Sequence, residues 1–183
     1  MPSFFTSPCW GGETRSACTV PQAPYTRVQT AGRGGIGKRT GMLKGIDPIL
    51  GPELLAVLRA MGHGDEIVVA DANFPAASVH ANVIRADGIA APRMVGAIAA
   101  LLPLDDFVPA AAFRMAVVDR PDEVPIIVAD FAAALAGGGY IGPIAALERF
   151  AFYDRARQAC AVIATGETRL YGNLILKKGV IRS

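Results

Sequence analysis

From Met42 onward the chain alternates helical patterns with short apolar runs, and this alternation leaves few architectures open to it. Apolar residues recur at helical spacing after Pro52, and Gly62 is expected to end this helix in the left-handed conformation. Glu66–Ala70 has the length and composition of a buried strand. We expect further helices over 92–102, 125–135 and 149–159, and further strands over 113–118, 160–164 and 173–177. Short apolar strands between helices predict an α/β fold, a single domain with a helix-covered sheet.

Residues 1–41 have a different character, because they are rich in glycine, proline and threonine and lack apolar periodicity. They carry five basic residues and one acid, whereas residues 42–183 carry thirteen basic and fifteen acidic residues. We therefore expect a disordered basic extension over 1–41 and the folded domain over 42–183. The extension is either a transit segment or the product of a start upstream of Met42. The mildly acidic domain lacks the basic field of a nucleic-acid-binding protein, so no nucleic-acid partner is expected.

Several patterns for other functions fail on inspection. The glycine-rich run 32–38 resembles a phosphate-binding loop, but Arg39 stands where a serine or threonine would reach magnesium. Two histidines and no Cys-x-x-Cys motif predict no metal site. No apolar run reaches the roughly 18 residues of a spanning helix, so no membrane partner is expected. Cys160 is the only cysteine after residue 41, which predicts a reducing, cytoplasmic location.

Four stretches carry residues suited to proton transfer or to ligand binding. His63 lies between two glycines, where it is either a proton-transfer group or an exposed turn residue. Asp71 directly follows a predicted strand, where it either binds a ligand or forms a turn. Near the C-terminus, Arg149 precedes three aromatic residues, and the run Tyr171-Gly172-Asn173 adds a hydroxyl, an open backbone and an amide. Together these groups offer directional hydrogen bonds for hydroxyls and rings for the apolar face of a sugar.

These stretches resemble the sugar mutarotase family of L-fucose mutarotase and D-ribose pyranase, the RbsD/FucU family. The resemblance runs from about Met42 to Ile181 and rests on several collinear motifs. The motifs are Met61-Gly62-His63-Gly64-Asp65-Glu66-Ile67, Asp71-Ala72-Asn73-Phe74-Pro75, Val83-Ile84-Arg85-Ala86-Asp87-Gly88, Arg149-Phe150-Ala151-Phe152-Tyr153, and Tyr171-Gly172-Asn173 through Leu176-Lys177-Lys178-Gly179-Val180.

Within this family the chain looks like the L-fucose branch, because it has Phe74-Pro75 in the loop, Arg149, and Gly172 where the ribose branch typically has alanine. Asn73 is a departure, since the fucose branch often has histidine there. The resemblance implies an isomerase that interconverts the α and β anomers of L-fucose or a related monosaccharide, without a cofactor or metal. The alternatives are a D-ribose pyranase and a non-catalytic sugar-binding accessory of a transport system.

The resemblance also implies residue roles. His63 is the expected proton donor and acceptor. The expected sugar-binding residues are Asp71, Arg149, Tyr171, Gly172 and Asn173, with Tyr153 and Asn73 as weaker candidates.

The spacing of His63 and Asp71 raises a geometric problem. An extended chain would put them on the order of 25 Å apart, too far for one monosaccharide. Either the chain folds back around Gly62 and Gly64, or two subunits share each site. Because the family forms rings, we expect a ring-like homo-oligomer with sites near subunit contacts.

Overall fold

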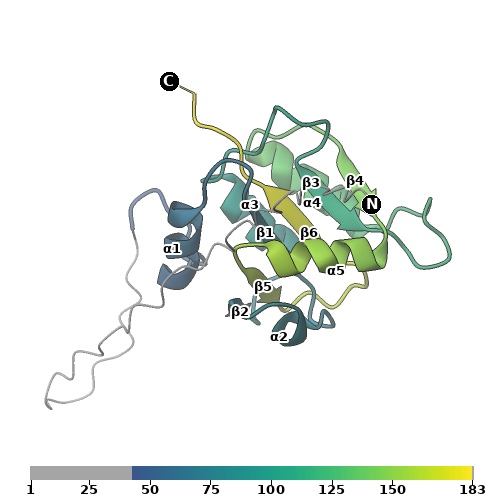
Figure 1. Ribbon diagram of the computed structural model, residues 1–183. Helices are drawn as coiled ribbons and strands as arrows, with labels where there is room; N and C mark the ends of the chain where they lie inside the picture. The colour runs from purple at the N-terminus through teal and green to yellow at the C-terminus, as the bar shows by residue number, and fades with distance from the viewer. Residues whose placement is uncertain (1–42, 183) are drawn as a thin grey trace, which may run out of the picture.

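The computed structural model describes residues 43–182, in which six short strands pair into one sheet with helices on both faces (Figure 1). The strands are β1 (Glu66–Ala70), β2 (Val83–Ala86), β3 (Ala112–Met115), β4 (Ile144–Leu147), β5 (Val162–Thr165) and β6 (Leu174–Lys177). The helices are α1 (Pro52–Ala60), α2 (Ala76–Val79), α3 (Ala91–Ala99), α4 (Ile127–Gly137) and α5 (Arg149–Gln158). The predicted fold class, an α/β domain with a helix-covered sheet, is confirmed.

The sheet has the strand order β2-β5-β1-β6-β3-β4. β6 runs antiparallel to its neighbours β1 and β3, and the other neighbouring pairs are parallel. The carboxyl ends of β1 to β5 therefore meet at one edge of the sheet, together with the first residue of β6. We call this the carboxyl edge and the opposite one the amino edge. Ligands of α/β sheets favour the carboxyl edge.

Alternating side chains of the central strands build two apolar layers. Ile67 and Val69 of β1 pack with α1, α3 and α4 on one face, whereas Val68 and Ala70 pack with α2 and α5 on the other. Figure 1 shows α5 lying across the sheet on the face opposite α3 and α4. All four of these β1 side chains are fully buried, so the strand that connects His63 to Asp71 is fixed in the core.

Three local features differ from the sequence prediction. The edge strands β2 and β4 were not predicted, because each is only four residues long and partly buried, and an arginine in β2 and two alanines in β4 fill middle positions. The one-turn helix α2 falls in a stretch that shows no periodicity. The left-handed conformation predicted for Gly62 is wrong, since Met61 ends α1 and the positive φ of +87° belongs to Gly64. The predicted extension 1–41 lies outside the described residues.

Candidate functional site

Asp71 stands at the carboxyl end of β1 and is 4% exposed. Its Oδ2 accepts hydrogen bonds from the Gly172 N–H at 3.1 Å and from Nδ2 of Asn173 at 3.0 Å, and its Oδ1 accepts from the Asn73 N–H at 2.9 Å. The Asp71 N–H in turn donates to Oδ1 of Asn173 at 3.0 Å. These bonds bring Asp71, Gly172 and Asn173 together across the β1–β6 pair, as expected for one binding site.

Burial raises the pKa of Asp71, while the N–H groups of Asn73 and Gly172 oppose that rise. Burial makes the ionised form of the carboxylate less favourable, and the hydrogen-bond donors fix its position. A buried acceptor at the edge of a sheet is suited to a directional bond with a ligand hydroxyl.

The run Tyr171-Gly172 has a backbone that only certain residues accept. Tyr171 has a φ of +59°, and its hydroxyl oxygen accepts from the Val118 N–H at 3.2 Å, which ties it to the segment that follows β3. At Gly172 an added Cβ would lie 2.9 Å from Cγ of Glu167 and 3.2 Å from Cβ of Asp71. A side chain at position 172 would therefore displace Glu167 or Asp71, whereas glycine allows the close approach that the Asp71 bonds need.

Arg149 occupies the first position of α5 directly after β4, so it lies on the same carboxyl edge as Asp71. Glu148 caps this helix, its Oε2 accepting from the Phe150 N–H at 2.7 Å and from the Ala151 N–H at 3.3 Å. The exposed Arg149 guanidinium lies 4.7 Å from the centre of the Phe150 ring. No hydrogen bond or ion pair within residues 43–182 joins Arg149 to Asp71.

The two weaker candidates differ in their surroundings. The half-buried Tyr153 packs its ring against Phe74 at 5.5 Å between centres, on the α5 face of the sheet. Asn73 supplies its backbone N–H to Asp71 and leaves its side chain exposed. Both residues therefore support the loop after β1 in addition to any contact with a ligand.

His63 lies at the amino edge, in the turn before β1. The turn is fixed by the Gly64 N–H, which donates to the Lys178 carbonyl at 2.8 Å, and by the Gly62 N–H, which donates to Oδ2 of Asp65 at 2.7 Å. The His63 side chain is 49% exposed, and its Nε2 lies 3.3 Å from Oδ1 of Asp105. An accessible imidazole beside a carboxylate is a suitable group for proton transfer.

Asp105 was missed by the sequence analysis. It is 2% exposed, its Oδ1 accepts from the Phe107 N–H at 3.1 Å, and its Oδ2 lies 4.0 Å from Nζ of Lys177. Burial raises its pKa, but the Phe107 N–H, His63 and Lys177 outweigh burial and hold the pKa below its ordinary value. No spacing rule links Asp105 to His63, because the contact depends on the pairing of residues 104 and 105 with the end of β6.

His63 and Asp71 therefore lie at opposite edges of the sheet. The five residues of β1 separate them, and at about 3.3 Å a residue the strand alone spans about 17 Å. The chain does not fold back around Gly62 and Gly64, so a single copy does not bring His63 and Asp71 together.

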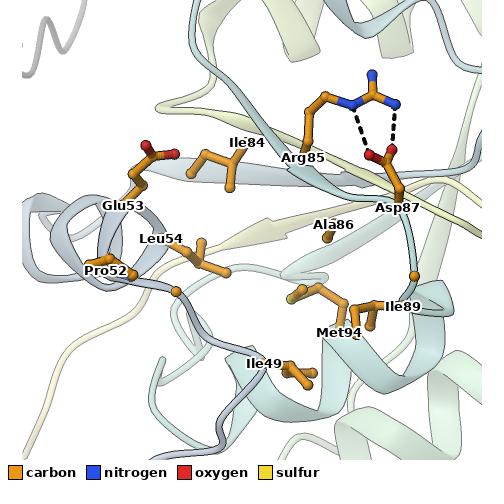
Figure 2. Close-up of a pocket in the computed structure, with 12 residues that line it drawn as sticks. Ile49, Pro52, Glu53, Leu54, Ile84, Arg85, Ala86, Asp87, Ile89 and Met94 are labelled. Atoms are coloured by element: carbon orange, nitrogen blue, oxygen red, sulfur yellow. Dashed lines mark hydrogen bonds and ion pairs between the residues drawn. The ribbon is translucent and has the colours of Figure 1, made fainter. Parts of the chain in front are cut away.

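Two cavities border β2. One of about 400 Å³ opens at the carboxyl edge, and Asp71, Phe74 and Thr165 contribute to its wall. The other, of about 390 Å³, lies between α1 and α3; Figure 2 shows its apolar floor, with the paired Arg85 and Asp87 at the rim. Of the predicted site residues, Asp71 alone lines the first cavity and none lines the second, so we place the candidate site at the first, beside the Asp71 carboxylate.

Among residues 43–182, no cluster of three or more histidine, cysteine, aspartate or glutamate side chains could hold a metal ion. The described helices also include none with the length and apolar character needed to cross a membrane.

Comparisons with known proteins identify the family of this domain. Residues 44–181 match the model of the RbsD / FucU transport protein family. The chain is 48% identical over 146 residues to the fucose mutarotase of Homo sapiens, covering 76% of this chain and 94% of that protein. It is 49% identical to the L-fucose mutarotase of Actinobacillus pleuropneumoniae serotype 5b, covering 76% and 97%. The crystal structure of the Streptococcus pneumoniae fucose mutarotase in complex with L-fucose superposes with a TM-score of 0.71 at 45% identity, covering 76% of this chain and all of that one.

Proposed function

Because this chain belongs to the RbsD/FucU family, we propose that it is a mutarotase, an isomerase that interconverts the α and β anomers of L-fucose or a related monosaccharide. The observation that carries the proposal is the buried carboxylate of Asp71, held by Gly172 and Asn173 beside a cavity at the carboxyl edge. The relatives that share this domain act on fucose, as their names state.

In the proposed reaction the pyranose ring opens and closes again. One group takes the proton of the anomeric hydroxyl, the anomeric carbon becomes a carbonyl as its bond to the ring oxygen breaks, and a second group protonates that oxygen. Closure reverses these transfers on either face of the carbonyl. Positioned acid and base groups accelerate such steps by typically about 10²–10⁴-fold. The reaction transfers no electrons, and it starts and ends with a neutral sugar.

Each predicted residue has a role in this scheme. His63 donates and accepts the proton, because its exposed imidazole is the described group best suited to proton transfer near neutral pH. Asp71 accepts a hydrogen bond from a sugar hydroxyl. The remaining sugar-binding residues are Arg149, Tyr171, Gly172 and Asn173, with Tyr153 and Asn73 contributing to the loop around them.

The distance between His63 and Asp71 supports sites shared between copies of the chain in a ring-like homo-oligomer. An exposed aromatic side chain lies at each of the two edges that would form a shared site. Phe107 is 66% exposed beside His63, and Phe150 is 61% exposed beside Arg149. Exposed apolar surface of this kind is typical of protein–protein contacts. One copy would thus supply His63, and its neighbour the carboxyl edge.

We also propose a cytoplasmic location, because the described domain has a single cysteine, the buried Cys160, and so has no internal disulfide to maintain.

The decisive experiment is saturation-transfer NMR on equilibrium mixtures of anomers of L-fucose, galactose, ribose and glucose. We expect catalytic amounts of the protein to transfer saturation between the two anomeric protons of L-fucose, more efficiently than for ribose. Preference for ribose would support the pyranase alternative.

The family description as transport proteins favours one alternative of another class, a sugar-binding accessory without catalytic activity. The same cavity serves both functions, and only proton transfer at His63 distinguishes them. If the wild-type protein binds L-fucose but leaves anomer exchange at its uncatalysed rate, the enzyme proposal is wrong. If exchange is accelerated and His63→Ala abolishes it while some binding remains, the accessory alternative is wrong.

A further inference from the structure

The contacts of the His63 ring distinguish its two nitrogens. Nε2 lies 3.3 Å from Oδ1 of Asp105, and the ring meets Phe107 edge-on at 5.6 Å between centres. Among residues 43–182, Nδ1 contacts no hydrogen-bond partner. One nitrogen thus faces a buried carboxylate, and the other is available to a ligand.

Asp105 is held in place from several directions. Its N–H donates to the Lys177 carbonyl at 3.1 Å, and its Oδ1 accepts from the Phe107 N–H at 3.1 Å. The backbone of Gly179 packs so closely that an added Cβ would lie 2.8 Å from Cα of Asp105. With 2% exposure, the carboxylate has little freedom to turn away from His63.

We propose that Asp105 is the positioning residue of His63: it keeps a proton on Nε2 and leaves Nδ1 as the nitrogen that exchanges protons with the sugar. This inference rests on the proposed function for its catalytic part only. The hydrogen-bond partner of one ring nitrogen decides which nitrogen carries the proton, so a carboxylate at Nε2 selects the Nε2–H form. When Nδ1 takes the proton of the anomeric hydroxyl, the same carboxylate stabilises the cation that forms.

Two basic residues and one further acid surround the pair of His63 and Asp105. Nζ of Lys177 lies 4.0 Å from Oδ2 of Asp105, which is the carboxylate oxygen that does not face His63. Arg182 lies over the Phe107 ring at 5.4 Å and pairs with the exposed Asp106 at 2.6 Å. Asp105 is therefore the acid that contacts His63, whereas Asp106 provides a matched acid next to it that does not.

The first test needs no activity. The chain has two histidines, so ¹⁵N-labelled histidine gives two sets of ring signals, and His63→Gln assigns them. We expect neutral His63 to carry its proton on Nε2 in the wild-type protein. His80 is an internal reference, because its Nε2 lies 2.8 Å from the Ala159 carbonyl and its Nδ1 accepts from the Asn82 N–H. A predominant Nδ1–H form of His63 would overturn the proposal.

The second test separates positioning from a structural role. Asp105→Asn should lower kcat for anomer exchange roughly tenfold to hundredfold, part of the ~10²–10⁴-fold that a positioned base contributes, with a much smaller change in KM. In a His63→Gln background that retains measurable exchange, the same change should lower the exchange rate no further, because residues that act as a unit are not additive. Asp106→Asn should leave kcat unchanged.

An unchanged kcat in Asp105→Asn, or an equal loss in both backgrounds, would overturn the proposal. If Asp105→Asn does not fold, the wild-type ring signals decide the matter. If the wild-type protein does not accelerate exchange, the proposed function fails, and the ring signals still decide whether Asp105 orients His63.

Discussion

Asp71 and Asn173 bind each other through two reciprocal hydrogen bonds at the carboxyl end of β1: the Asp71 N–H donates to Oδ1 of Asn173, and Nδ2 of Asn173 donates to Oδ2 of Asp71, both at 3.0 Å. Neither residue is more than 5% exposed. The pair joins β1 to the start of the antiparallel β6 and helps to hold Oδ2 of Asp71, while Oδ1 accepts from the Asn73 N–H.

Asn173→Asp should disrupt this pair. The new side chain has the same shape, but it replaces the Nδ2 donor with an oxygen beside Oδ2 of Asp71. Two carboxylates at this distance cannot both ionise without a large cost. We expect the free energy of unfolding at neutral pH to fall by about 1–3 kcal/mol and L-fucose binding to be lost. Urea unfolding measures the first and calorimetry the second.

The matched control for that variant is Asn73→Asp, whose side chain is exposed and which bonds Asp71 only through its backbone. Its stability should stay within about 0.5 kcal/mol of wild type. Equal losses in the two variants would contradict the role given to the Asn173 side chain.

Gly172→Ala should damage both the fold and the site. The added Cβ would lie within 2.9 to 3.2 Å of Glu167, Arg169 and Asp71, so the loop would have to move. We expect a loss of about 1–3 kcal/mol in unfolding free energy and weaker sugar binding. Gly88→Ala is the control, because nothing lies within 4 Å of a Cβ there. A stable Gly172→Ala protein with normal binding would show that the close packing is not needed.

The stability of the protein should depend on pH through Asp71. Burial raises its pKa above the ordinary value of 3.8, so ionisation is less favourable in the folded state than in the unfolded one. Its contribution is therefore fully present below pH 3.8 and is lost as the pH rises through the raised pKa.

Comparison with Asp71→Asn isolates this effect, because the acids with lowered pKa, such as Asp105 and Glu167, are common to both proteins. The unfolding free energy of the wild type minus that of the variant should fall as the pH is raised from below 4 toward neutrality. A difference that increases with pH would contradict the assigned direction.

Mixed assemblies test the shared site. His63→Ala and Asp71→Asn should each be inactive alone, but chains carrying one or the other, co-expressed and co-purified through two tags, should regain activity. If each site takes His63 from one copy and Asp71 from its neighbour, about a quarter of the sites in a random equal mixture are intact. No recovery in assemblies shown to contain both chains would mean that one copy supplies the whole site.

A chain that begins at Met42 should keep the fold and the activity. The family match starts at residue 44, and every predicted site residue follows it. Thermal unfolding and anomer exchange of this chain should equal those of the full chain. A loss of either would show that residues 1–41 contribute to the domain.

The core elements could be predicted because local pattern and burial agree in them. Glu66–Ala70 is apolar, short and buried, and the structure has β1 at those residues. β2 and β4 are the two outer strands of the sheet, so each pairs with only one neighbour. Both are only partly buried, and burial therefore constrains their sequences less than that of β1.

The site was predictable where a strand end or a motif marks it and unpredictable where pairing of distant segments creates it. Asp71 follows a buried strand, which is a position that favours ligands. Asp105 reaches His63 only because the segment before β3 pairs with the end of β6, and nothing in the local sequence around Asp105 encodes that contact.

β6 has one further consequence. Its four residues start beside the Asp71 carboxylate and end at Lys177, next to Asp105. A single short strand therefore connects the carboxyl edge to the amino edge. In a ring with shared sites, each copy would supply its carboxyl edge to one site and its His63 to the next site. A chain that lacks both His63 and Asp71 would then inactivate two sites. In a random mixture with such chains, activity would fall with the square of the fraction of wild-type chains.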